Sequence, residues 1–229
     1  MSKHVGQAAV RGFLMSKEAF SMPSSLIIKL TYGLVASGAL VFFLFQKKLL
    51  SKKLSKIVSK IYFLPTFPIT ILMRLGNYWT TIDDTLLLGC APMGFLGHPS
   101  QLHKLGVRGV INMCYEYNGP KGYYSALGIK QLHLPTVDHF EPTVSQMAEA
   151  VRFIQEYKNK GEKVYVHCKA GHGRAASIAM CWMMNELPDV TPKVSEDFAA
   201  ELSSLTCNRK AFRYLRVIPK RLINCDCSH

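Results

Sequence analysis

Acidic residues are nearly absent from the start of this chain. Residues 1–64 contain ten Lys and Arg residues but one acid, Glu18, and so contribute +9 of the formal net charge of +13. Residues 65–229 contain eighteen basic and fourteen acidic residues, which leaves +4. Such an asymmetry indicates contact with a membrane or a nucleic acid. The basic run at residues 47–60 lacks interleaved aromatic residues, so we expect no nucleic-acid partner.

Patterns typical of structural metal sites and disulfide frameworks are also missing. The seven cysteines do not show zinc-site spacing, and the pair Cys225 and Cys227 lacks a second pair or a His tandem. No cleavable secretory signal is recognisable, so we expect reduced thiols in an intracellular compartment. Repeats and low-complexity tracts are absent, and the 48% hydrophobic content excludes a disordered protein. The 229 residues suit one domain of about 150 residues with an appendage.

A long apolar run occupies residues 26–45, LIIKLTYGLVASGALVFFLF. A helix of this length is about 30 Å long and predicts a transmembrane helix, with a buried core helix as the alternative. Residues 46–73 contain six lysines, all between positions 47 and 60, and have Leu and Ile at helical spacing. This pattern predicts a basic amphipathic segment on an anionic membrane surface. The positive-inside rule places this flank and the following domain on the electronegative side. Residues 1–25 form a plain polar tail or a targeting segment that weakly resembles a mitochondrial presequence.

Residues 74–224 are expected to form the globular domain. Apolar runs bounded by turn residues predict strands at residues 86–89, 107–114, 129–134 and 163–168, the third ending before Pro135. Apolar residues spaced by three and four predict helices at residues 144–157, 174–187 and 194–205. Strands that alternate with helices predict an α/β domain with a largely parallel sheet.

One stretch carries the chemistry. The sequence VYVHCKAGHGRAASIAMCWMM reads as a strand, a Gly-containing loop and a helix, and in it Cys168 is followed by five residues and then Arg174. A thiolate is favoured at a strand end that faces a helix N-terminus and a ring of backbone amides. The same amides can cradle phosphate oxygens, and two loop glycines permit close approach. Arg174 adds a planar fork that holds two phosphate oxygens, so that no metal or cofactor is required.

These roles predict phosphomonoester hydrolysis. Attack by Cys168 would give a phosphocysteine intermediate, which water then hydrolyses. The departing alkoxide needs an acid, and Asp138, on a Pro-flanked loop after the third strand, is the candidate, with Glu141 as the runner-up. His167 is expected to orient the loop by hydrogen bonding. The loop residues expected to bind the substrate phosphate are Lys169, Ala170, Gly171, His172, Gly173 and Arg174.

The Cys-x5-Arg loop resembles the signature loop of the cysteine-dependent protein tyrosine phosphatase superfamily. Lys169 and the Glu116–Tyr117 pair are part of a closer likeness, which covers about residues 76–220 and includes the stretches NYWTTIDDTLLLGCAP, VRGVINMCYEY and HLPTVDHFEPT. This part of the chain is similar to the mitochondrial lipid-phosphatase branch of the dual-specificity phosphatases, the phosphatidylglycerophosphate phosphatases. The resemblance implies a central mixed sheet flanked by helices.

The resemblance also implies site roles and a substrate. It places the nucleophile on Cys168, the phosphate-binding residue on Arg174 and the general acid on Asp138. The implied reaction converts phosphatidylglycerophosphate to phosphatidylglycerol, toward cardiolipin, at the matrix face of the mitochondrial inner membrane. A lipid substrate fits the tethered domain independently, because an enzyme whose substrate stays in the bilayer benefits from being attached there.

Two positions depart from the family pattern and leave alternatives open. Ala175 stands where a Ser or Thr usually supports the leaving thiolate, so we expect slower hydrolysis of the intermediate. His172 stands where this branch often has an Arg. One alternative is a tethered dual-specificity phosphatase of phosphoproteins or phosphoinositides, and another is a phosphate-binding pseudophosphatase. The endoplasmic reticulum, or another membrane with the domain facing the cytosol, is the alternative location.

Overall fold

The computed structural model describes residues 24–186. They belong to two compact units, of which the first ends at Leu49 and the second begins at Leu50. In the first unit, α2 (Ser24–Gln46) is a continuous helix about 34 Å long, with exposed apolar side chains such as Leu34. Its length and composition suit a membrane-crossing helix. The predicted helix at residues 194–205, nearly all of the predicted tail 1–25, and the Cys225–Cys227 pair lie outside the described residues.

A five-stranded sheet forms the centre of the second unit, with its strands in the order β1-β2-β5-β3-β4. Its strands are β1 (Trp79–Thr81), β2 (Leu86–Gly89), β3 (Val107–Cys114), β4 (Lys130–Thr136) and β5 (Lys163–His167). In this sheet β1 pairs antiparallel with β2, and the other neighbouring strands are parallel. The predicted α/β fold with a mixed, largely parallel sheet is confirmed.

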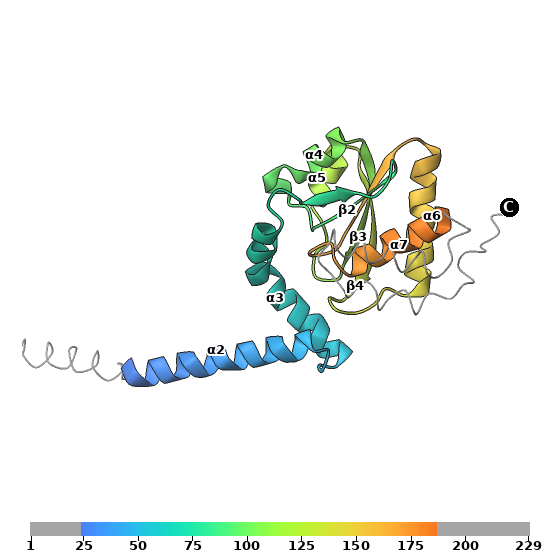
Figure 1. Cartoon of the computed structure of the whole chain (residues 1–229). Coiled ribbons are helices and arrows are strands. Elements are labelled where there is room, and N and C mark those ends of the chain that lie inside the picture. Colours follow the sequence, from blue (N-terminus) through green and yellow to red (C-terminus); the bar gives the residue numbers. More distant parts are fainter. Residues whose placement is uncertain (1–23, 187–229) are drawn as a thin grey trace, which may run out of the picture. The chain divides into compact units, whose positions relative to one another are not determined.

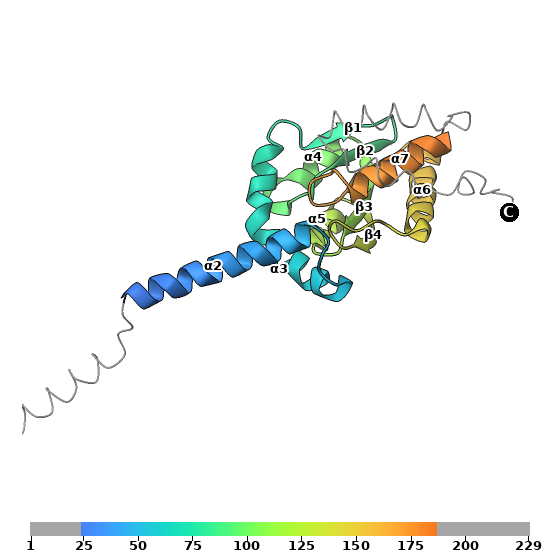
Figure 2. The ribbon, with the colours of Figure 1, turned by 60° about the horizontal axis from the view of Figure 1, so that its bottom comes forward.

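Helices cover both faces of the sheet (Figures 1 and 2). One face packs against α6 (Val144–Asn159) and α7 (Arg174–Glu186). The other face packs against α4 (His98–Lys104) and α5 (Lys121–Ala126). The short helix η1 (Gly94–Leu96) precedes α4. Because side chains alternate along a strand, Leu86 and Leu88 join the α6–α7 core while Leu87 joins the other core. Burial on both faces explains why these strands are apolar along their whole length.

The third predicted strand, at residues 129–134, is longer in the structure than the sequence predicts. β4 continues through Pro135 to Thr136, whereas the sequence predicts an end before the proline. β4 is an edge strand of the described sheet, where a residue without an N–H is tolerated because one side of the backbone has no ladder partner. Thr136 pairs with Cys114 across a register shift. β5 ends at His167, so Cys168 is the first residue of the following loop.

Helix α3 (Lys52–Met73) belongs to the second unit. Its N-terminus is capped by Ser51, whose side chain accepts a hydrogen bond from the Leu54 amide at 3.4 Å. Phe63 and Phe67 pack with Ala91 and Met93 beside the segment that follows β2. The face turned to the domain buries Ser55, Val58, Ser59, Phe63 and Phe67. The sequence pattern, which starts the globular domain at residue 74, does not predict this packing.

Candidate active site

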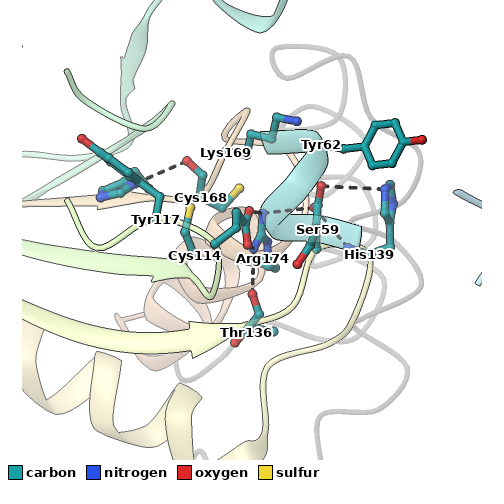
Figure 3. Close-up of polar contacts among 12 residues, drawn as sticks. Ser59, Tyr62, Cys114, Tyr117, Thr136, His139, Cys168, Lys169 and Arg174 are labelled. Atoms are coloured by element: carbon teal, nitrogen blue, oxygen red, sulfur yellow. Dashed lines mark hydrogen bonds and ion pairs between the residues drawn. The ribbon is translucent and has the colours of Figure 1, made fainter. Parts of the chain in front are cut away.

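The candidate site lies where three neighbouring parallel strands end. Glu116 follows β3, Asp138 follows β4 and Cys168 follows β5, each within two residues of its strand. The register places Cys114 opposite Thr136 at this edge. Parallel strands present their carboxyl ends at one edge, which is the usual binding edge of an open α/β sheet. Residues that are 22 to 54 positions apart in sequence, Cys114, Thr136 and Cys168, lie close together there (Figure 3).

The loop at residues 168–174 is held in a tight curve. Gly171 has φ +75°, and a Cβ atom there would lie 2.9 Å from the carbonyl of Gly89, so only glycine fits without displacing backbone. The Ala91 amide donates to the Lys169 carbonyl at 3.2 Å, and the Ser177 amide donates to the Gly173 carbonyl at 3.0 Å. Within residues 24–186, the amides of residues 169–173 donate to no backbone carbonyl. Their N–H groups can therefore serve a bound anion.

Arg174 is the first residue of α7 and is 2% exposed. Its Nη1 donates to Glu116 Oε2 at 3.0 Å and to the Thr136 carbonyl at 2.7 Å, while Nη2 donates to Glu116 Oε1 at 2.8 Å. Nη2 also lies 3.0 Å from Asp138 Oδ1. Burial alone would lower the pKa of Arg174, but the two carboxylates raise this pKa well above its ordinary value. The guanidinium is therefore charged and fixed in direction, and Cys168 lies beside it (Figure 3).

Asp138 is 28% exposed at its side chain and accepts a hydrogen bond from the His139 amide at 3.1 Å. Burial would raise the pKa of Asp138, but Arg174, followed by His139 and Lys169, outweighs it and holds the pKa below its usual value. Asp138 is thus ionised at neutral pH as long as the guanidinium faces it. A phosphate dianion bound at Arg174 would offset that positive charge and raise the pKa of Asp138.

Two histidines of the loop region are neutral at physiological pH. His167 is fully buried, its Nδ1 lies 3.3 Å from the Cys168 carbonyl, and burial lowers its pKa to about 3. His172 Nδ1 lies 3.3 Å from Arg74 Nη2, and burial, with a contribution from Arg74, lowers its pKa to about 4. The same Arg74 nitrogen donates to the Ala170 carbonyl at 2.9 Å. Positive charge at this side of the loop therefore comes from Arg74 rather than from His172.

Lys169 faces α3. Its ammonium donates to Thr66 Oγ1 and lies 5.7 Å from the centre of the Phe63 ring. Burial lowers the pKa of Lys169, while Asp138 and Glu116 raise it in part. Figure 3 shows the part of α3 that carries Ser59 passing beside this end of the loop. Helix α3 therefore contributes directly to the surroundings of the site.

Two other thiols, those of Cys90 and Cys114, lie near the site. Burial raises the pKa of Cys90 to about 12 and that of Cys114 well above its ordinary value, so both thiols stay protonated.

Ala175 is fully buried, and the Ser177 hydroxyl donates to the Gly173 carbonyl at 3.1 Å. Among the described residues, no three His, Cys, Asp or Glu side chains are grouped as metal ligands.

Three residues of the site are absent from the sequence prediction as functional residues. Glu116 could have been found, because it is the acid directly beyond a predicted parallel strand, where site residues gather. Thr66 and Arg74 gave no comparable signal. They lie about 100 residues before their partners Lys169 and His172, and only the packing of α3 brings them to the loop.

Known proteins resemble this chain in sequence and in fold. The family model "Dual specificity phosphatase, catalytic domain" matches residues 90–189. The rat (Rattus norvegicus) phosphatidylglycerophosphatase and protein-tyrosine phosphatase 1 is 30% identical over 159 residues, which cover 64% of this chain and 81% of that protein. The chain belongs to the phosphatidylglycerophosphate phosphatase branch of the dual-specificity phosphatases.

Other members of this branch match in part. Phosphatidylglycerophosphate phosphatase PTPMT2 of Arabidopsis thaliana is 40% identical over 111 residues, or 47% of this chain. The match spans about half of that relative (48%), and 37% of the Arabidopsis thaliana PTPMT1. The crystal structure of PTPMT1 in complex with PI(5)P superposes with a TM-score of 0.53 at 26% identity, covering 64% of this chain and 95% of that one. The predicted family and fold are thereby confirmed.

Proposed function

We propose that this chain hydrolyses phosphomonoesters through a covalent phosphocysteine on Cys168. The observation that carries the proposal is the meeting of Cys168, the charged fork of Arg174 and the Asp138 carboxyl at one edge of the sheet. The thiolate attacks phosphorus, an S–P bond forms and the P–O bond to the alcohol breaks. The bond electrons leave with the alkoxide, which takes the Asp138 proton. Arg174 and the loop amides at residues 169–173 hold the phosphoryl oxygens.

The second step regenerates the enzyme. Asp138, now a carboxylate, accepts a proton from water while the water oxygen attacks the phosphocysteine. The S–P bond breaks, and inorganic phosphate and the Cys168 thiolate are released. A hydroxyl at position 175 would stabilise that thiolate, and the alanine present there supports a slower second step.

The proposed substrate is phosphatidylglycerophosphate, and the proposed product is phosphatidylglycerol for cardiolipin synthesis. The names of the relatives support this choice. The proposed anchor is α2, with the Lys-rich flank of residues 47–60 on the electronegative side of the membrane. The proposed location of the domain is the matrix side of the mitochondrial inner membrane. A phosphoinositide is the second candidate substrate, because PTPMT1 has been crystallised with PI(5)P.

A substrate panel tests this proposal. The full chain in lipid nanodiscs is assayed for phosphate release from phosphatidylglycerophosphate, PI(5)P and a phosphotyrosine peptide. We expect kcat/KM for phosphatidylglycerophosphate to exceed the other two values by at least about tenfold, or 1.4 kcal/mol of transition-state stabilisation. A preference for PI(5)P or the peptide would overturn the substrate assignment. Release from none of them would favour the pseudophosphatase alternative.

Replacing Asp138 by Asn tests the general acid. Loss of an acid should lower kcat about 100-fold for an alkyl phosphate, whose alkoxide must be protonated as it leaves. We expect a much smaller loss with p-nitrophenyl phosphate, because nitrophenolate leaves without a proton. The fall in kcat with rising pH, caused by deprotonation of the acid, should also disappear.

Glu141→Gln is the matched control, since Glu141 lies three residues further along the same loop. It should retain the wild-type ratio of activities on the two substrates. The reverse pattern, with loss in Glu141→Gln and normal activity in Asp138→Asn, would assign the acid to Glu141.

A further inference from the structure

Helix α3 has two opposite apolar faces. The inner face is the one buried against the domain, centred on Ser59 and Phe63. On the opposite side, side chains spaced by three, four or eight residues are 45–73% exposed within the described structure. We call them the outer stripe: Leu54, Ile57, Ile61, Leu64 and Leu72. At 100° per residue they fall within about 80° of the helix circumference, and an exposed apolar stripe of this kind marks an interaction surface.

The charge beside the outer stripe is entirely positive. Lys53 and Lys60 border the outer stripe on one side, and Lys60, with Lys56, also reaches the Tyr115 ring, at 4.9 and 5.3 Å from its centre. The sequence contains no acid between Glu18 and Asp83. An apolar stripe with lysines along one border is complementary to the interface of an anionic bilayer, where a Lys near the surface contributes about 1 kcal/mol. An anionic lipid surface is therefore the occupant that the charges favour.

The length of the connecting chain agrees with that occupant. Residues 47–51 separate α2 from α3 in the sequence, and five residues span at most about 18 Å. An α2 that crosses a bilayer therefore keeps the start of α3 close to the lipid headgroups. A second copy of this chain has no such tie.

Helix α3 is long and apolar enough to cross a membrane itself, but its inner contacts exclude that. Thr66 accepts from Lys169, and Arg74, directly after the helix, donates to the Ala170 carbonyl at 2.9 Å. Phe63 stacks on Tyr117 with ring centres 5.4 Å apart. Crossing the bilayer would replace these partners by lipid and leave polar groups unsatisfied. A position along the surface keeps every inner contact.

We propose that the outer stripe of α3 inserts into the interface of an anionic bilayer, with α3 lying along the surface. Since the inner face contacts the catalytic loop through Lys169 and Ala170, the loop is then held about 10 Å, one helix diameter, from the lipid. A phosphate monoester on a lipid headgroup meets the loop without leaving the membrane. This inference deepens the proposed function and rests on it for the nature of the substrate, but docking itself is independent of turnover.

Depth-dependent quenching tests the docking. The full chain carrying Leu64→Trp is reconstituted in vesicles of phosphatidylglycerol and phosphatidylcholine, with brominated acyl chains as the quencher. Arg152→Trp, on an exposed position of α6, is the matched control, and the unsubstituted chain supplies the background from Trp79 and Trp182. We expect loss of the emission added at position 64 and none of that added at position 152. Equal emission with and without bromine at position 64 would overturn the proposal.

A second experiment measures the consequence for turnover. The triple variant Ile57→Ser, Ile61→Ser, Leu64→Ser should lose about tenfold in phosphate release from lipid in anionic vesicles, with hydrolysis of p-nitrophenyl phosphate unchanged. Equal losses on both substrates, or none on either, would contradict the docking role. If the wild type formed dimers in detergent and the triple variant did not, a second copy of this chain would be the occupant of the outer stripe and the proposal would be wrong. A wild type inactive on every lipid would count against the proposed function, and the quenching result would still decide the docking.

Discussion

Cys168→Ser should abolish phosphate release from every substrate, with a loss of at least about 10⁴-fold in kcat. A serine hydroxyl has nearly the size of the thiol but is not ionised at neutral pH, so the attacking anion is lost. The phosphate-binding groups remain, because Arg174 and the loop amides do not depend on the sulfur. The variant should therefore bind the substrate with little change while turning none of it over. Steady-state kinetics and a binding titration with phosphatidylglycerophosphate measure the two effects.

Trapping the intermediate distinguishes nucleophilic from structural roles. Rapid acid quench of the wild type with labelled substrate should give a phosphorylated chain, and Cys168→Ser should give none. Cys181→Ser is the control, since burial raises the pKa of Cys181 to about 12 and this thiol on α7 is not a nucleophile. That control should form the intermediate as the wild type does. A labelled phosphoenzyme in Cys168→Ser would show that another group attacks phosphorus.

Local patterns were sufficient for two of the central strands and for the loop. Strands β2 and β3 have the predicted bounds because both faces of a central parallel strand are buried, which gives short apolar runs between turns. The loop at residues 168–174 was recognisable because its chemistry depends on residues that lie close together in sequence. In contrast, β1 and the extension of β4 past Pro135 depend on which strand is a neighbour or an edge, and local sequence does not report that.

The environment of the site was predictable only in part. Cys168, Arg174 and Asp138 each follow or begin a predicted element, and the structure brings them together. The bidentate contact of Glu116 with Arg174 depends on strand order, since β3 must lie beside β5. The contacts of α3 depend on which of its two apolar faces meets the domain. Both faces have helical periodicity, so the pattern alone cannot distinguish the inner face from the outer stripe.

Arg174→Lys should lower kcat/KM by about 10³-fold, although the positive charge is kept. A lysine has one nitrogen and cannot hold two phosphoryl oxygens while also meeting Glu116 and the Thr136 carbonyl. We expect kcat to fall and KM to rise, because the fork acts both on the bound phosphate and on the transferring group. Kinetics with p-nitrophenyl phosphate measure the fall in kcat, and inhibition by inorganic phosphate measures the loss of phosphate binding.

The same substitution should also destabilise the fold, because the Arg174 and Glu116 side chains are 3% and 1% exposed. Leaving a buried carboxylate imperfectly paired costs about 3 kcal/mol, measurable by urea unfolding. Adding Glu116→Gln to Arg174→Lys removes the unpaired charge, so stability should recover in part while activity does not. This split separates catalysis from folding: if the double variant regained activity together with stability, Arg174 would matter through the ion pair with Glu116 and not through its hold on phosphate.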